Sequence, residues 1–134
     1  MTRNRSAGLV DALAHYDRVV EVGIGERVDV AAALAARGAT VIATDVYERD
    51  VPESVEFVID DVTEPDERVY EGADAVYARN CPPELQRPLV DIAEAVGADA
   101  LFTTLGADPV VVEATPQARD GETLFRAHTR DTSE

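Results

Sequence analysis

Apolar positions along the chain follow two spacings in turn, one typical of helices and one typical of strands. Between residues 6 and 16 four apolar residues recur at helical spacing, and Ser6 is placed to act as the N-cap. Short β-branched runs bounded by glycine or acidic residues are typical of buried strands. Such runs predict five strands, at residues 18–22, 40–45, 55–60, 73–78 and 99–104.

Further helices are predicted between these strands. The alanine-rich stretch 28–37 ends at Gly38, which is the position of a C′ glycine. Residues 64–71 are long enough for one or two helical turns, and Pro82 and Pro83 open a helix through Val96 because proline is tolerated in a first helical turn. The tail differs: residues 110–113 and 123–127 are predicted strands, with turn residues at 120–121.

Alternation of strands and helices predicts one α/β domain spanning residues 1–134. We expect a doubly wound, mostly parallel, Rossmann-like sheet, to which the tail adds a C-terminal antiparallel hairpin or edge strand. Residues 1–5 and 130–134 are expected to be disordered tails. No apolar run is long enough for a membrane span, and the N-terminus lacks the apolar region of a signal peptide, so we expect a cytoplasmic protein.

Charge changes this picture more than any other aspect of composition. The chain has 27 acidic residues against 12 basic ones, a net charge of −15, and every base is an arginine. An acidic surface without lysine is typical of an extreme halophile, in which concentrated salt screens the repulsion between carboxylates. The absence of a basic stripe argues against a nucleic-acid partner.

Several common kinds of catalytic site are excluded by the residues that the chain lacks. Without lysine there is no P-loop and no Schiff-base chemistry. The two histidines, His15 and His128, are too far apart for a zinc-protease helix, and we expect no metal site. Cys81 is the only cysteine, so no internal disulfide forms, and we expect a buried, inert thiol.

A glycine-containing turn after the first strand is the strongest candidate for a binding site. Gly23 and Gly25 lie between a strand and a helix, where the backbone can approach a ligand closely. Asp45 ends the next strand 20 residues after Gly25, where an acid hydrogen-bonds ribose hydroxyls in such folds. We expect Asp45 to act in binding rather than in packing, and Tyr47 either to stack on adenine or to cover the core.

The third glycine of the dinucleotide fingerprint is replaced by Val28, which argues against NAD. Glu21-x-Gly23-x-Gly25 instead resembles the first motif of S-adenosylmethionine-dependent methyltransferases, although Arg27 stands where that motif has its third glycine. The resemblance implies that Glu21 helps to hold the methionyl amino group of the cofactor. It also implies ribose binding by Asp45 and adenine recognition by Asp60 or Asp61.

The segment after the fourth predicted strand reads Arg79-Asn-Cys-Pro-Pro-Glu-Leu85. It resembles a small uncharacterised archaeal family of truncated, methyltransferase-like Rossmann proteins that carries a Pro-Pro-Glu-Leu element at this place. Ligands in open α/β sheets bind at the carboxyl ends of strands, so Arg79 and Asn80 are expected to face that crevice and are the candidate catalytic residues. The alternative is that residues 80–83 only cap and start the next helix.

The resulting hypothesis is a methyltransferase-like domain that binds S-adenosylmethionine or a related adenosine ligand. One alternative is a non-catalytic nucleotide-binding or protein-interaction module that forms a homodimer through its C-terminal hairpin, and another is an NAD-binding module. Because the domain is small, any substrate site is expected to need a partner chain.

Overall fold

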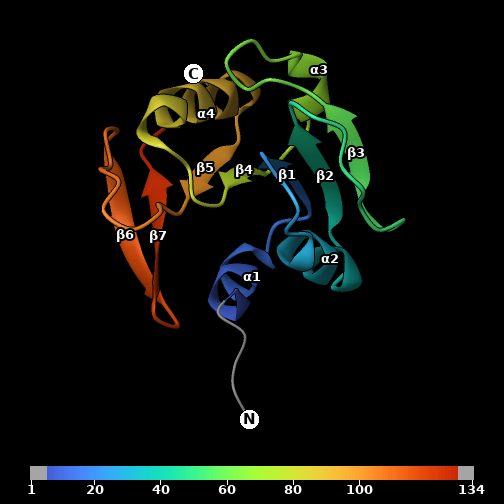
Figure 1. The fold of residues 1–134 in the computed structure, drawn as a ribbon, viewed down its shortest axis with the longest axis horizontal. Helices are drawn as coiled ribbons and strands as arrows, with labels where there is room; N and C mark the ends of the chain where they lie inside the picture. The colour runs from blue at the N-terminus through green and yellow to red at the C-terminus, as the bar shows by residue number, and fades with distance from the viewer. Residues whose placement is uncertain (1–5, 130–134) are drawn as a thin grey trace.

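One mixed sheet of seven strands, in the order β3-β2-β1-β4-β5-β7-β6, forms the centre of the chain (Figure 1). It belongs to a computed structural model that describes residues 6–129, so the tails expected to be disordered lie outside the described residues. The strands are β1 (Arg18–Val22), β2 (Thr40–Asp45), β3 (Glu56–Ile59), β4 (Ala75–Ala78), β5 (Asp99–Phe102), β6 (Ala114–Arg119) and β7 (Glu122–Ala127).

The sheet is doubly wound about β1. This strand pairs in parallel with β2 on one side and with β4 on the other, so the strand order reverses between β1 and β4. The first five strands are all parallel, whereas β7 lies antiparallel between β5 and β6. The predicted fold class is confirmed, including the C-terminal antiparallel strands. In such sheets ligands bind at the carboxyl ends of the strands, beside the switch in strand order.

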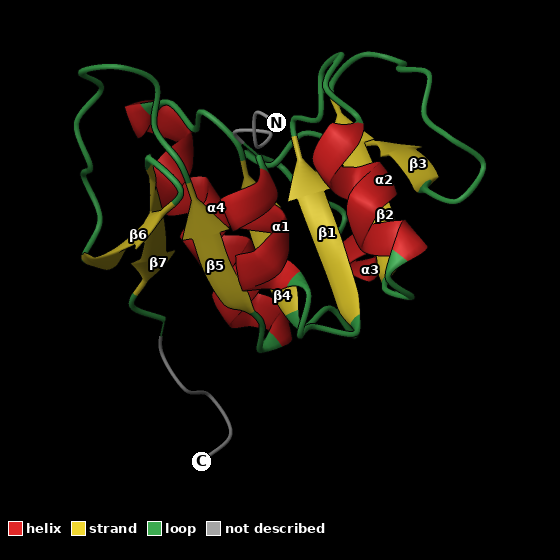
Figure 2. Cartoon of the chain, turned by 90° about the horizontal axis from the view of Figure 1, so that it is seen from below, coloured by secondary structure: helices red, strands yellow, loops and turns green. Residues whose placement is uncertain are grey.

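Helices cover both faces of the sheet (Figure 2). The helices α1 (Ala7–Leu13) and α2 (Asp29–Ala36) lie over one face, while α3 (Glu67–Tyr70) and α4 (Pro83–Val96) lie over the other. Successive residues of a strand point to opposite faces, so Val19 packs beneath α1 and α2 whereas Val20 packs beneath α4. This alternation aims the side chain of Glu21 at the α1–α2 face, which is otherwise apolar.

The expected strand at residues 110–113 is wrong. The backbone there is held by a side chain of α4 rather than by a neighbouring strand, because Val111 donates its N–H to the amide oxygen of Gln86. The last pair of strands starts instead at Ala114, and the hairpin turn falls at Asp120 and Gly121 as predicted. Pro116 is accommodated because β6 is an edge strand.

No helix within residues 6–129 is both long and apolar enough to cross a membrane.

Candidate functional site

The turn after β1 exposes its backbone at the carboxyl end of the sheet. Gly23 and Gly25 adopt φ angles of +69° and +58°, which L side chains rarely tolerate. A Cβ atom placed on either glycine would meet nothing within 4 Å, so the space above the turn is open. The N–H groups of Gly23 and Ile24 both donate to the carbonyl oxygen of Thr44. The turn is therefore fixed from below by β2 and open from above.

Asp45 joins the glycine turn after β1 to the loop that follows β2. Its side chain accepts the N–H of Gly25 at 2.8 Å and that of Tyr47 at 3.0 Å, and Nε of Arg49 lies 3.4 Å away. The residue is only 6% exposed. The expectation that this acid plays no part in packing is wrong, because a carboxylate at the end of β2 is the nearest acceptor for the N–H of the glycine turn.

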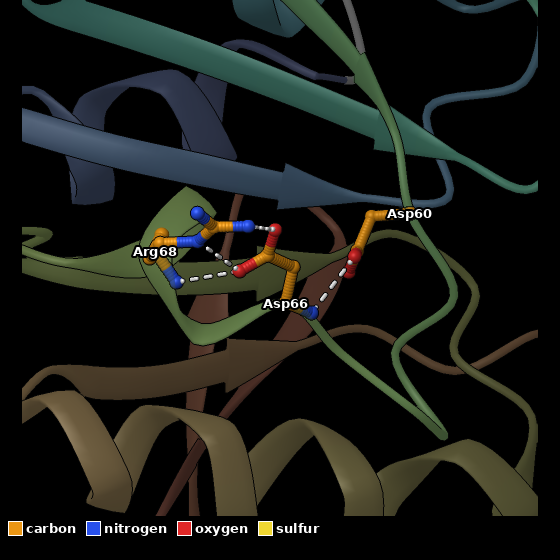
Figure 3. Close-up of polar contacts among 3 residues, drawn as sticks. All are labelled: Asp60, Asp66 and Arg68. Carbon is orange, nitrogen blue, oxygen red and sulfur yellow. Dashed lines mark hydrogen bonds and ion pairs between the residues drawn. The ribbon is translucent and has the colours of Figure 1, made fainter.

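Asp60 and Asp61, at the end of β3, are also engaged within the chain. The carboxylate of Asp60 accepts the N–H of Asp66 at 3.0 Å (Figure 3). It also accepts the hydroxyl of Tyr70 at 2.7 Å. Asp61 accepts the N–H and the hydroxyl of Thr63. Asp66 in turn caps α3 and binds Arg68, as the close-up shows. These bonds shape the loop between β3 and α3.

Three apolar side chains are exposed beside these acids. Val46 and Tyr47 directly follow β2, and Ile59, which pairs with Asp45 in the sheet, ends β3. Their exposed fractions are between 53% and 68%. Exposed apolar side chains at the carboxyl ends of two neighbouring strands suit contact with a flat, apolar ligand. Tyr47 therefore does not cover the core, and stacking on a ligand stays a prediction.

Glu21 is buried beneath the glycine turn, with 1% of its surface exposed. Its Oε1 atom accepts the hydroxyl of Tyr77, the residue beside it on β4, at 2.7 Å. Burial raises the pKa of Glu21 to about 8, although the bond from Tyr77 and the charge of Arg79 act in the opposite direction. The carboxyl is therefore mostly neutral at pH 7. An acid in a buried strand needs such a partner, and this requirement is the signal by which Tyr77 could have been found from the sequence.

Arg79 leaves the end of β4 and pairs with the start of α2. Its Nη1 atom lies 2.7 Å from Oδ1 of Asp29, whose other oxygen accepts the hydroxyl of Ser6 at 2.8 Å. Burial acts to raise the pKa of Asp29, but the hydrogen bonds from Ser6 and Arg79 outweigh it and leave that pKa below its ordinary value. The side chain of Ser6 thus binds α2, and it makes no hydrogen bond that caps α1.

The next two residues join the ends of β4 and β5. Asn80 has a φ of +52°, unusual for a residue other than glycine, and its N–H donates to the hydroxyl of Thr103 at 2.8 Å. The N–H of Cys81 donates to the carbonyl oxygen of the same threonine. Burial raises the pKa of the Cys81 thiol to about 12, so the expected inert thiol fits the structure. The positive φ of Asn80 is a form of backbone strain, and strained residues cluster at functional sites.

Two cavities open along this edge of the sheet. The smaller, of about 120 Å³, lies at the switch in strand order and is lined by Gly23, Arg79 and Asn80 among others. The larger, of about 660 Å³, is bounded partly by the β6–β7 hairpin and also contacts Arg79 and Asn80. A single chain thus offers a ligand-sized cavity, and the need for a partner chain at a substrate site stays a prediction.

The predicted site residues are brought together only in part. Gly23, Arg79 and Asn80 share the smaller cavity, whereas neither cavity is lined by the four acids Glu21, Asp45, Asp60 and Asp61. Sequence reasoning missed Gln86, a fully buried side chain that fixes the loop beside the larger cavity. Within residues 6–129, no three His, Cys, Asp or Glu side chains are grouped so that they could hold a metal ion.

Comparison with known families gives one match over nearly the whole chain. A family model described as "Uncharacterised protein family (UPF0146)" matches residues 5–129. A UPF0146 protein of Halobacterium salinarum is 66% identical over 100 residues, which are 75% of this chain and 78% of that protein. One from Archaeoglobus fulgidus is 50% identical over 91 residues, covering 68% and 70% of the two chains. Relatives in a halophile accord with the acidic composition.

Solved structures of similar fold include S-adenosylmethionine-dependent methyltransferases. An RNA methyltransferase from Salinibacter ruber in complex with S-adenosyl-L-homocysteine has a TM-score of 0.66 at 18% identity, covering 100% of this chain and 97% of that one. A TehB-like S-adenosylmethionine-dependent methyltransferase from Corynebacterium glutamicum has a TM-score of 0.64 at 16% identity, covering 97% and 89%. At such low identity the likeness establishes the methyltransferase-like fold.

Proposed function

This chain belongs to the UPF0146 family, and from that premise we propose that it binds S-adenosylmethionine or S-adenosylhomocysteine at the carboxyl ends of β1 and β4. Support comes from the fold, since structures of similar fold include methyltransferases with S-adenosylhomocysteine bound. The predicted motif Glu21-x-Gly23-x-Gly25 lies at the switch in strand order, which is where open α/β sheets bind ligands.

One observation carries the proposal: the glycine turn is held in a left-handed conformation beneath open space, beside the smaller cavity. The left-handed φ angles favour glycine at both positions, and no packing contact lies above the turn. The absence of side chains there lets a ligand approach the backbone. The N–H of Gly25 is already bonded to Asp45, so the turn is ordered before a ligand arrives.

The residues present fit an adenosine ligand in most respects. Val46, Tyr47 and Ile59 offer an exposed apolar surface for an adenine ring. Asp45 accepts two N–H donors, and Nε of Arg49 lies 3.4 Å from one of its oxygens. A carboxylate has about four lone-pair positions, so acceptor capacity for a ribose hydroxyl is left. When bound, S-adenosylmethionine supplies an activated methyl group on a sulfonium.

Glu21 acts differently from the role that the resemblance implies. It lies under the turn and does not line either cavity, so direct contact with a ligand is not supported. Its bond with Tyr77 instead joins β1 to β4 at the switch in strand order. We assign Glu21 as a positioning residue that fixes the strand from which the glycine turn leaves.

NAD is the less suitable ligand. The dinucleotide fold needs a glycine at the position of Val28, which here contacts the α1–α2 side of the core. Glu26, exposed in the same turn, would also face a pyrophosphate with like charge. We therefore expect NAD to bind at least about tenfold more weakly than either adenosyl ligand.

Calorimetric titration in molar salt tests the proposal. S-adenosylmethionine, S-adenosylhomocysteine and NAD are titrated separately into the full chain and into two alanine variants, Gly23→Ala and Gly97→Ala. Both glycines have positive φ angles and open space where a Cβ atom would lie, but Gly97 caps α4 far from the turn. Both variants should lose similar stability, while only Gly23→Ala should weaken binding of the adenosyl ligands.

Two results would contradict this assignment. Tighter binding of NAD than of either adenosyl ligand would favour the dinucleotide alternative. No heat of binding with any of the three compounds, from a protein with folded circular dichroism, would favour a protein-interaction module instead.

A further inference from the structure

The larger cavity is bounded by five segments that are far apart in sequence. They are Ser6 at the start of α1, the β1–α2 loop, the end of β4, the β5–β6 loop and the β6–β7 hairpin. The β5–β6 loop arches beyond the carboxyl end of β5 in Figure 2, and the hairpin stands at the sheet edge in Figure 1. The volume of about 660 Å³ lies in the range of small-molecule sites, which is roughly 300–1,000 Å³.

One wall of this cavity is fixed by a buried amide. The Nε2 atom of Gln86 donates to the carbonyl oxygen of Pro109 at 2.9 Å, and its Oε1 atom accepts the N–H of Val111 at 2.7 Å. Gln86 is fully buried on α4, so both ends of its amide are used on the loop. The loop is therefore held in place although Leu105 and Val110, which line the cavity, stay exposed.

Charged residues on the cavity wall are divided by sign between its two sides. Arg27 and Arg79 come from the β1–α2 loop and the end of β4, whereas Asp108 and Glu122 come from the β5–β6 loop and the start of β7. Arg27 forms no ion pair within the described part of the chain, and Arg79 spends one nitrogen on Asp29. A guanidinium has five N–H donors, so Arg79 keeps others for a ligand.

Hydroxyl groups and apolar side chains make up most of the remaining wall, the hydroxyls being those of Ser6, Thr104 and Thr123. Leu105, Val110 and Phe125 line the cavity, and the ring of Phe125 is stacked on that of Phe102 at a centroid distance of 5.5 Å. A purely anionic ligand would meet the two arginines but be repelled by the two acids, and a purely cationic ligand would have the reverse difficulty. A ligand with both charges and an apolar part complements the whole wall.

We propose that this cavity binds a free amino acid with an apolar side chain, carboxylate toward Arg27 and Arg79 and ammonium toward Asp108 and Glu122. The proposal rests on the proposed function in one respect: the amino acid is the second ligand, held beside the adenosyl ligand. The two cavities share Arg79 and Asn80, so the two ligands would lie next to one another.

The adenosyl ligand itself carries an amino-acid end, and the experiment separates these two sources of the same chemistry. Phenylalanine is titrated calorimetrically into the full chain in molar salt, with and without saturating S-adenosylhomocysteine. Binding of phenylalanine in both conditions is expected. Loss of that binding in the presence of S-adenosylhomocysteine would overturn the proposal, because the cavity would then serve the amino-acid end of the adenosyl ligand.

Two analogues test the division of charge. The compounds 3-phenylpropionate and 2-phenylethylamine each lack one charge of phenylalanine. Each should bind at least about tenfold more weakly, because each loses hydrogen bonds between charged groups. Equal binding of phenylalanine and either analogue would overturn the proposal.

Variants that remove a single charge test whether phenylalanine binds in the larger cavity. Arg27→Gln should weaken phenylalanine binding about tenfold and leave the binding of 2-phenylethylamine, which lacks the carboxylate, unchanged. Asp108→Asn should also weaken phenylalanine binding about tenfold and leave the binding of 3-phenylpropionate, which lacks the ammonium group, unchanged. Arg87→Gln removes the same charge from the exposed face of α4 and is the matched control. If Arg27→Gln and Arg87→Gln weaken phenylalanine binding equally, the effect comes from the net charge of the protein and the proposed site is overturned. Binding of S-adenosylhomocysteine is measured in every variant, so failure of the adenosyl site is recognised separately.

Discussion

Replacing the buried acid of β1 by its neutral isostere, Glu21→Gln, should stabilise the protein in a pH-dependent manner. The glutamine keeps an acceptor oxygen for the Tyr77 hydroxyl and fills the same volume. It removes only the ability to ionise. The difference in the free energy of unfolding between the two proteins therefore measures how much the fold is destabilised by an ionisable group in a site that opposes its charge.

The magnitude follows from the two pKa values. Burial raises the pKa of Glu21 from 4.5 to about 8 in the folded chain. Below pH 4.5 both states are protonated, and Glu21 has no effect on the pH dependence. As the pH rises from 4.5 to about 8 the unfolded state loses its proton first, so stability falls by about 1.4 kcal/mol per pH unit. Above about pH 8 the loss is complete, at roughly 5 kcal/mol as an upper value.

The assay is denaturant unfolding in molar salt at pH 5, 6, 7 and 8, on wild type, Glu21→Gln and the exposed control Glu53→Gln. Stability of Glu21→Gln relative to wild type should increase by about 3 kcal/mol between pH 5 and 7. Glu53→Gln should show no such trend, because that residue is exposed in the β2–β3 loop. A difference between Glu21→Gln and wild type that is constant from pH 5 to 8 would refute the reasoning, since it would mean that Glu21 is ionised in the fold.

Three further outcomes are expected. Asp45→Asn should destabilise the protein by about 1–3 kcal/mol in denaturant unfolding, because one of two backbone N–H groups loses its acceptor; unchanged stability would mean that these bonds are replaced by water. Transfer from 1 M to 0.01 M salt should unfold the chain, because the Debye length grows from about 3 Å to 30 Å around a net charge of −15; a far-UV circular dichroism spectrum that does not change would contradict this. Cys81 should react with iodoacetamide far more slowly in the folded than in the unfolded chain at pH 8, because burial raises its pKa to about 12; equal rates would show that the thiol is accessible.

The sequence by itself determined the order and type of nearly all the elements. Their signals are local: a β-branched run such as 18–22 favours a buried strand, and Gly97 ends the helix of residues 83–96 where a C′ glycine is expected. The glycine turn and the acid that ends β2 could also be predicted, because both belong to a fixed spacing within one βαβ unit. The parallel topology followed from alternation of strands and helices alone.

Only the tertiary structure decided what each polar side chain binds. Residues 110–113 are as rich in β-branched residues as any strand. The N–H of Val111, however, donates to the side chain of Gln86, 25 residues earlier, and is therefore not available to a neighbouring strand. Glu21 and Tyr77 meet because the order of strands places β4 beside β1, a pairing between residues 56 apart in sequence. The larger cavity exists because the hairpin lies beyond β5. Contacts of this kind depend on strand order and loop path, and no local spacing encodes them.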